Sequence, residues 1–281
     1  LTGESGVGKE VVARFIHRQS ARRNGPFVAI NCAAIPDSLL EATLFGYEKG
    51  AFTGAQQAQA GKFEQAQDGT LLLDEVTEMP MGLQAKLLRV LQEREVERVG
   101  GKKPVALNIR IVATSNRDMA EAVAKGVFRE DLYYRLNVFP VAIPPLRDRP
   151  LDIVPIARYF LVEHGGRFGR SGVSFGAQAE QALLRHTWPG NVRELENVIQ
   201  RALILSTGPE IGGEHLSLAS APGRESPKVV AEMPVHESDK KVDNMKDLER
   251  EHILRTLAEV DGSRKMAIER LGISERTLRY K

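Results

Sequence analysis

The chain is poor in the residues that indicate secretion, a membrane or a metal centre. Its 281 residues include one cysteine, Cys32, which excludes a disulfide within the chain and suits the reducing cytoplasm. Because Cys32 follows an apolar run, we expect a small buried hydrophobe rather than a nucleophile. No secretory leader and no apolar run of about 18 residues occurs, so we expect no membrane contact. The six histidines lack metal-ligand spacing.

The composition is that of a soluble globular protein, with 42% hydrophobic and 27% charged residues. Its net charge of +2 creates no global field that demands nucleic acid. Residues 1–148 alternate apolar strands with helical patterns, which predicts an α/β domain with a parallel sheet and helices on both faces. The segment Ile143–Pro150 contains three prolines and predicts a domain boundary. Residues 149–218 predict a purely helical lid, and residues 219–245 predict a flexible linker.

A phosphate-binding loop opens the chain. Residues 3–9 match the GxxxxGK pattern, in which backbone N–H groups and a lysine bind phosphates, and an apolar helical pattern follows. The pattern normally ends in Ser or Thr, where this chain has Glu10, so a glycine-rich helix cap is the alternative. The candidate nucleotide-binding residues of this segment are Gly3, Glu4, Ser5, Gly6, Val7, Gly8, Lys9 and Glu10.

Two adjacent carboxylates follow a second predicted strand. Leu71 to Leu73 form an apolar run typical of a buried parallel strand, and Asp74 and Glu75 follow it. Asp74 is suited to hold Mg²⁺, directly or through water, and Glu75 to orient and deprotonate an attacking water. The alternative is a pair of solvated acids at a strand end.

Asparagines follow two further predicted strands. Asn31 follows the strand Phe27–Ile30 and is placed to bond the catalytic carboxylate. Asn116 follows the strand Asn108–Ala113 and is placed to sense the γ-phosphate or to hold the attacking water. Either asparagine could instead cap a helix.

The hexapeptide GAFTGA stands between the phosphate loop and the carboxylates. Its two glycines permit tight turns, and its phenylalanine has no periodic apolar neighbours. The residues predict either an exposed tip that contacts a partner or a surface loop whose ring folds back onto its own domain. The candidate contact residues are Gly50, Ala51, Phe52, Thr53, Gly54 and Ala55.

Three arginines are candidates for contact with the nucleotide. Arg129 and Arg135 lie six residues apart, which on a helix places them about 120° from each other. An arginine supplied by a neighbouring subunit accelerates phosphoryl transfer roughly 10³–10⁵-fold, and the alternative is ion pairs with Glu130 and Asp131. Arg193 lies in the first turn of a predicted lid helix and is placed to reach the nucleotide.

The tail, residues 246–281, predicts a helix-turn-helix. A helix over 246–260 precedes two shorter ones, Arg264–Leu271 and Glu275–Lys281, and residues 263–281 carry six basic and two acidic side chains. A helical hairpin with a solvated basic face is the alternative. The candidate DNA contacts are Arg276, Thr277, Arg279 and Tyr280.

Together these residues resemble the bacterial enhancer-binding activators of sigma-54 RNA polymerase, a branch of the AAA+ ATPases. In that branch Glu usually follows the phosphate-loop lysine, so Glu10 fits. Tyr47 departs from it, since histidine is commoner there, and so does Ser115. The segments EATLFGYEKG at 41–50 and GKFEQAQDGTLLLDE at 61–75 look most similar to flagellar two-component regulators of the FleR and FlrC type. The matching motifs are GESGVGKE at 3–10, NCAA at 31–34, LFGYEKGAFTGA at 44–55, LLLDE at 71–75, FREDLYYRLNVFP at 128–140 and WPGNVREL at 188–195.

The resemblance implies roles for matching positions. Lys9 and the loop glycines bind ATP phosphates, Asp74 and Glu75 serve Mg²⁺ and water, and Asn31 switches Glu75. Arg129 and Arg135 act as fingers across a subunit interface, Arg193 senses the nucleotide from the lid, and residues 50–55 contact sigma-54.

The resemblance also implies partners: sigma-54 RNA polymerase, enhancer DNA, and further copies in a ring, a hexamer or heptamer. We expect the chain to be a window from a longer protein whose N-terminal part includes a receiver domain served by a sensor kinase. The alternatives are a general AAA+ remodelling ATPase and a non-catalytic DNA-binding regulator that uses nucleotide only to assemble.

Overall fold

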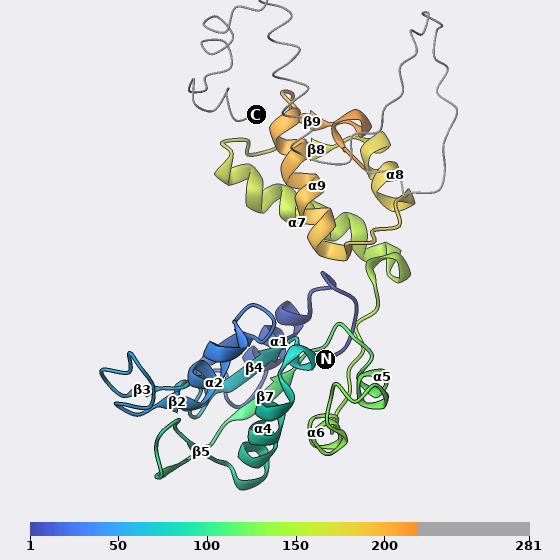
Figure 1. Cartoon of the computed structure of the whole chain (residues 1–281). Helices are drawn as coiled ribbons and strands as arrows, with labels where there is room; N and C mark the ends of the chain where they lie inside the picture. The colour runs from blue at the N-terminus through green and yellow to red at the C-terminus, as the bar shows by residue number, and fades with distance from the viewer. Residues whose placement is uncertain (219–281) are drawn as a thin grey trace, which may run out of the picture. The chain divides into compact units, whose positions relative to one another are not determined.

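The structure, a computed structural model, describes residues 1–218 (Figure 1). Its centre is a three-stranded sheet of β1 (Phe27–Asn31), β4 (Thr70–Asp74) and β7 (Arg110–Ala113) in the order β1-β4-β7. Both pairings are parallel, as predicted. The central strand is β4, and its residues 70–73 are all buried, which explains why it reads as an unbroken apolar run. The carboxyl ends of the strands share one edge, with Asn31 opposite Asp74.

One hydrophobic core joins the sheet to the helices between residues 37 and 136. The helix α4 (Met81–Glu93) is amphipathic, since Leu83, Leu87 and Val90 recur at helical spacing and are buried. The helices of residues 1–142 are α1 (Lys9–Arg18), α2 (Asp37–Phe45), α3 (Lys62–Gln65), α4 (Met81–Glu93), α5 (Met119–Ala124) and α6 (Glu130–Leu136), with the 3₁₀ turn η1 (Val76–Glu78). The alternation of strands and helices therefore gave the correct fold class.

Two antiparallel hairpins that the sequence pattern did not reveal lie beside this core. They are β2 (Gly46–Tyr47) with β3 (Gln59–Ala60), and β5 (Glu95–Glu97) with β6 (Pro104–Ala106). The segment after β5 joins them, because Val99 accepts a backbone hydrogen bond from Glu48 and donates one to Gly46, at 3.0 and 2.9 Å. The residues between β2 and β3 form a loop that projects away from the central sheet (Figure 1).

Residues 143–218 enclose a second hydrophobic core around the fully buried Trp188. Its elements are η2 (Leu146–Asp148), α7 (Pro150–Arg167), β8 (Ser174–Phe175), α8 (Ala177–Arg185), α9 (Asn191–Leu205), β9 (Glu210–Ile211) and η3 (Gly213–His215). The prediction of helices alone was wrong for this part, since β8 and β9 form a short parallel pair. Strands of two residues are too short to show an alternating pattern.

The strand expected at Asn108–Ala113 begins later, at Arg110. Side chains engage Asn108 instead: its amide donates to Asp68 at 2.7 Å and its backbone carbonyl accepts from Arg22 at 2.8 Å. Among residues 1–218, no helix has both the length and the apolar character needed to cross a membrane. The expected linker and DNA-binding tail lie outside the described residues.

Candidate functional site

The glycine-rich loop leads directly into α1, which begins at Lys9. Gly3, Gly6 and Gly8 all have positive φ, which other residues adopt at a cost. At Gly8, with φ of 98°, no atom lies within 4 Å of the position that a Cβ would take, so this part of the loop is uncovered. An open backbone followed by a helix N-terminus is the geometry that binds phosphate groups.

Lys9 is buried, and its ammonium group bends back over the loop. Its Nζ donates hydrogen bonds to the carbonyl oxygens of Gly3 and Glu4, at 2.8 and 3.0 Å. Burial lowers the pKa of Lys9, and the negative charges of Asp74 and Glu75 oppose that shift. The lysine therefore lies within electrostatic reach of both carboxylates, as the predicted site requires.

Two neighbours orient the Asp74 carboxylate at the end of β4. Asn31 donates from Nδ2 to Asp74 Oδ2 at 3.2 Å, and the Thr114 hydroxyl donates to Asp74 Oδ1. Thr114 is buried, and its oxygen also accepts a hydrogen bond from the backbone N–H of Glu75 at 3.1 Å. Sequence reasoning gave no role to Thr114. The one available signal was its position directly after a strand that neighbours the carboxylates.

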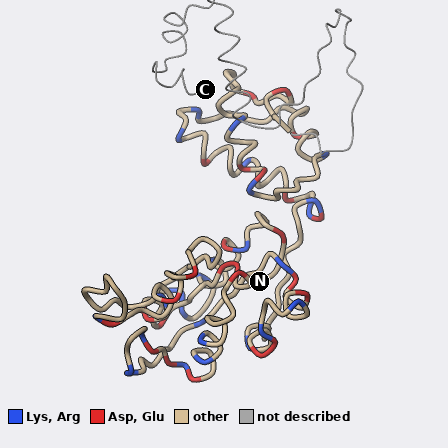
Figure 2. The backbone as a smooth tube through the Cα atoms, in the orientation of Figure 1, with Lys and Arg blue, Asp and Glu red and all other residues tan. Residues whose placement is uncertain are grey.

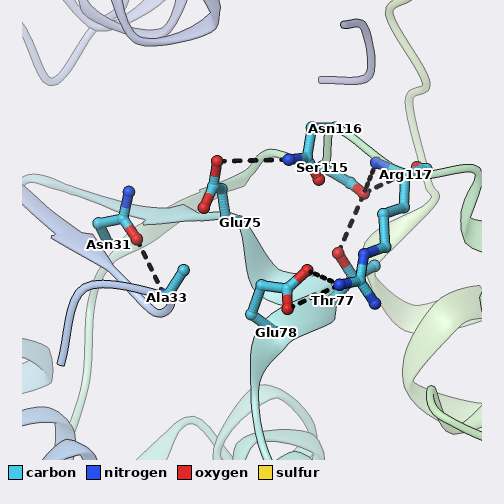
Figure 3. Close-up of polar contacts among 8 residues, drawn as sticks. All are labelled: Asn31, Ala33, Glu75, Thr77, Glu78, Ser115, Asn116 and Arg117. Carbon is cyan, nitrogen blue, oxygen red and sulfur yellow. Dashed lines mark hydrogen bonds and ion pairs between the residues drawn. The ribbon is translucent and has the colours of Figure 1, made fainter. Parts of the chain in front are cut away.

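Glu75 has a left-handed backbone, with φ of 54° and ψ of 49°. This conformation is uncommon for a non-glycine residue and is frequent at functional sites. Its carboxylate accepts a hydrogen bond from Asn116 Nδ2 at 3.4 Å (Figure 3). Two predicted residues, Glu75 and Asn116, thus meet although they come from different strand ends.

Neither candidate asparagine caps a helix. The cap of α2 is Pro36 and that of α5 is Asp118. Asn31 instead accepts hydrogen bonds from the N–H groups of Ala33 and Ala34, at 2.8 and 3.1 Å, so its side chain closes a turn while its amide faces Asp74. Figure 3 draws Asn31 with its bond to Ala33, and Glu75 with its bond to Asn116.

Glu10 points to its own helix, where it pairs with Arg14 at 2.7 Å and is exposed. This position therefore offers no hydroxyl to a metal ion. Among residues 1–218, no cluster of three or more acidic, histidine or cysteine side chains could hold a metal. Beside nucleotides, Mg²⁺ is usually held by one or two carboxylates together with phosphate oxygens and water, so the lack of such a cluster does not decide the role of Asp74.

Cys32 is buried next to these acids and is no nucleophile. Burial, followed by the charges of Asp74 and Glu75, raises its pKa to about 12. The thiol therefore stays protonated at neutral pH.

Arg193 and Asn116 face one open cleft of about 550 Å³. Arg193 donates from Nη1 to Ser5 Oγ at 3.1 Å, so it reaches the phosphate loop from the first turn of α9. The cleft is lined by Glu4, Ser5, Asn116, Pro189, Gly190, Arg193, Glu194, Asn197 and Arg201.

The finger candidates lie elsewhere and differ from each other. Arg129 stands just before α6, so the helical rotation expected between it and Arg135 does not apply. Its guanidinium pairs with Asp131 at 2.7 Å, and the exposed Arg135 donates to the Leu91 carbonyl at 2.9 Å. In this single subunit the structure does not bring either arginine to the phosphate loop.

The hexapeptide at 50–55 is the end of the loop between β2 and β3. Gly50 donates to the Ala55 carbonyl at 2.8 Å, which closes the tip, and Ala55 is buried. Thr53 is exposed, and Phe52 is 44% exposed while its ring meets that of Tyr47 edge-on at 4.9 Å. The tip is thus presented at the surface, although its phenylalanine is partly covered. The candidate DNA contacts at 276–280 lie outside the described residues.

Comparison with known families agrees with this geometry. Residues 1–142 match the sigma-54 interaction domain, residues 147–232 the AAA+ ATPase lid domain, and residues 244–281 the bacterial regulatory proteins of the Fis family. The chain is 55% identical to the response regulator protein FleR of Pseudomonas aeruginosa and 50% identical to the transcriptional regulatory protein FlbD of Caulobacter vibrioides. Each match covers 100% of this chain and 63% of the relative.

A solved structure shares the fold. The structure of NtrX from Brucella abortus in complex with ADP matches with a TM-score of 0.73 and 33% identity, over 99% of this chain and 62% of that one. The chain therefore spans a little over three fifths of the length of these relatives, at 62–63%. Since the first family model covers residues 1–142 and the relatives align along the chain, the chain belongs to the family of proteins with a sigma-54 interaction domain.

Proposed function

We propose that the chain is the ATPase and DNA-binding part of an activator of sigma-54 RNA polymerase. The observation that carries the proposal is the meeting of Lys9, Asp74 and Glu75 in a domain that also projects an uncharged GAFTGA tip. The structures of NtrX with ADP and with ATP support a nucleotide in the phosphate loop. A protein with these partners works in the cytoplasm.

The residues suit in-line hydrolysis of ATP. The loop from Gly3 to Gly8 and Lys9 bind the phosphates, and Glu75 orients the attacking water and takes its proton. Asp74 and a bound phosphate oxygen would hold Mg²⁺, which neutralises charge on the phosphates. A hydrogen bond from Asn116 holds the Glu75 carboxylate toward the carboxyl end of β7.

We propose that a second subunit completes the site, and the position of the arginines supports this. Arg129 and Arg135 do not contact the phosphate loop of their own chain, and both lie on the helix α6 or at its start. A finger supplied to a neighbour requires a head-to-tail interface, which closes into a ring, a hexamer or heptamer. Arg193 contacts the loop from the same chain and would transmit nucleotide state to the lid.

The tip at 50–55 is the proposed contact with sigma-54. Glu48 and Lys49 stand at the start of this loop, and the sequence then has no charged residue from Gly50 to Gly61, so most of the loop between β2 and β3 is tan in Figure 2. Such a tip binds through its phenylalanine, its hydroxyl and its backbone rather than through charge. Hydrolysis would move the tip and remodel the closed promoter complex into an open one.

The remaining partners rest on the tail and the relatives. Residues 244–281 match Fis-family regulators, so Arg276, Thr277, Arg279 and Tyr280 are proposed to bind enhancer DNA. The response regulator FleR supports a receiver domain and a sensor kinase, and we extend the proposal to flagellar genes.

An ATPase assay of the full-length protein across a dilution series tests the proposal. Turnover per subunit that rises cooperatively with concentration is the expected result, since each site needs its neighbour. A general AAA+ remodeller would show the same turnover, but it would not open sigma-54 promoters. Absence of turnover at every concentration would support the nucleotide-assembled DNA-binding regulator instead.

A further inference from the structure

Asn191, at the start of α9, is a buried amide that ties three segments together. Its side chain is fully buried and its backbone is left-handed, with φ of 53°. Its Oδ1 accepts from the Leu146 N–H at 2.8 Å, and its Nδ2 donates to Glu4 Oε2 and to the Ser5 carbonyl, both at 3.1 Å. Burying an amide is costly unless its hydrogen bonds are satisfied, so this contact is specific.

The phosphate loop also caps α9. The first N–H groups of a helix lack partners within it. In α9 the backbone N–H groups of Val192 and Arg193 both donate to the Gly6 carbonyl, at 2.9 and 3.3 Å. The approach is close, because a Cβ on Gly6 would lie 2.4 Å from the Gly190 carbonyl oxygen. This contact therefore requires glycine at position 6.

The neighbouring loop residues are held in the same way. Arg149 donates from Nη2 to the Val7 carbonyl at 2.8 Å, and Arg147 donates to the Glu4 carboxylate at 2.9 Å. The carbonyls of three successive loop residues, Ser5, Gly6 and Val7, thus all bond to residues 149–193. Fixing these carbonyls restricts the rotation of the peptide groups whose N–H groups would meet a phosphate.

We propose that Asn191 is a positioning residue that presets the phosphate loop for nucleotide and couples its occupancy to α9. The inference rests on the proposed function, since it concerns nucleotide bound at this loop. α9 also carries Arg193, whose Nη1 contacts Ser5, so one helix start both holds the loop and presents the sensor. A purely structural role is the alternative, because the Asn191 N–H also closes the turn at Trp188, at 2.8 Å.

Asn191→Asp is the decisive variant. Aspartate matches asparagine in size and tolerates the left-handed backbone, but it loses both donors and sets a carboxylate beside Glu4. We expect nucleotide binding weakened roughly tenfold or more, as for the loss of a hydrogen bond to a charged group. In the double variant with Glu4→Gln, the new amide donates to the new carboxylate, and we expect much of the loss to be recovered.

The experiment is a titration of the full-length protein with a fluorescent ADP analogue, together with KM and kcat for ATP and a melting curve without nucleotide. Gln181→Glu, which adds the same charge at an exposed position of α8, is the matched control and should bind like the wild type. The expected result is a raised Kd and KM for Asn191→Asp, with rescue in the double variant.

Equal Kd values for Asn191→Asp and the wild type would overturn the inference. So would a lowered melting temperature in both single variants with strictly multiplicative effects on Kd, because that result assigns Asn191 a structural role alone. Failure of the wild type to bind the analogue would instead contradict the proposed function. The two failures are therefore distinguishable.

Discussion

The amide of Asn31 donates to Asp74 Oδ2 at 3.2 Å and not to the adjacent Glu75, whose carboxylate bonds to Asn116 at 3.4 Å. The two neighbouring acids are thus oriented by amides from opposite sides of β4, one after β1 and one after β7. This separation suits the two tasks proposed for these acids, a fixed metal ligand for Asp74 and, for Glu75, a base that must be able to turn.

Glu75→Gln should bind ATP and fail to hydrolyse it. The substitution keeps the size of the side chain but removes the base, which costs roughly 10²–10⁴-fold in rate. Phosphate release and nucleotide affinity, measured on the same preparation, check this expectation. Normal hydrolysis by the variant would remove Glu75 from the chemistry.

Thr114→Val should lower kcat for ATP about tenfold while KM changes little. The hydroxyl donates to Asp74 and accepts from the N–H of Glu75, so its loss leaves both groups less well oriented. The expected rise in the activation free energy is about that of one hydrogen bond. Thr114→Ser keeps the hydroxyl and serves as the control. Equal loss in both variants would show that packing, rather than the hydroxyl, matters at this position.

Tyr47→Leu should release Phe52 at the loop tip. The two rings meet at 4.9 Å, and the Tyr47 hydroxyl lies 2.7 Å from Gln59 Oε1. Because an aromatic pair is worth about 0.5–1.5 kcal/mol, chymotrypsin cleavage mapped to Phe52 should accelerate roughly two- to tenfold. Tyr47→Phe keeps the ring and should stay near the wild-type rate. Similar rates in all three proteins would show that Tyr47 does not hold the tip.

The contribution of Glu4 to stability should depend on pH. Its hydrogen bond with Arg147, followed by that with Asn191, lowers the pKa of Glu4 to about 2. A carboxyl whose pKa is lower in the folded state stabilises the fold above its unfolded pKa of about 4.3, and loses this effect as the pH falls toward 2. The melting-temperature deficit of Glu4→Gln, a few degrees at most for an exposed pair, should therefore shrink below about pH 4.5. A deficit that grows on acidification would contradict the assignment.

Much of the site could be predicted because it depends on local patterns. The apolar run of β4 ends in two acids, and the register of a parallel sheet then brings Asn31 opposite Asp74. The left-handed backbone of Glu75 left no mark in the sequence. The bridging role of Thr114 was equally hidden, because it arises from the pairing of β4 with β7.

Apart from the reach of Arg193, the lid contacts could not be predicted, because they join distant segments. Glu4 and Asn191 stand 187 residues apart, and no periodicity links a loop glutamate to the first residue of a late helix. The spacing argument for Arg129 and Arg135 failed for a different reason: α6 begins at Glu130, so only one of the two arginines is helical.

The central claim, that ATP chemistry works through the tip at 50–55, is tested most directly with Thr53→Ala. Wild-type protein with ADP and a metal fluoride that mimics the transferring phosphate should form a stable complex with sigma-54. Thr53→Ala should keep its ATPase rate within about twofold, since Thr53 is exposed and lies on a loop separate from the phosphate loop, yet form no complex and open no promoter. Failure of the wild type to bind sigma-54 with the mimic present, or promoter opening by Thr53→Ala, would contradict the account.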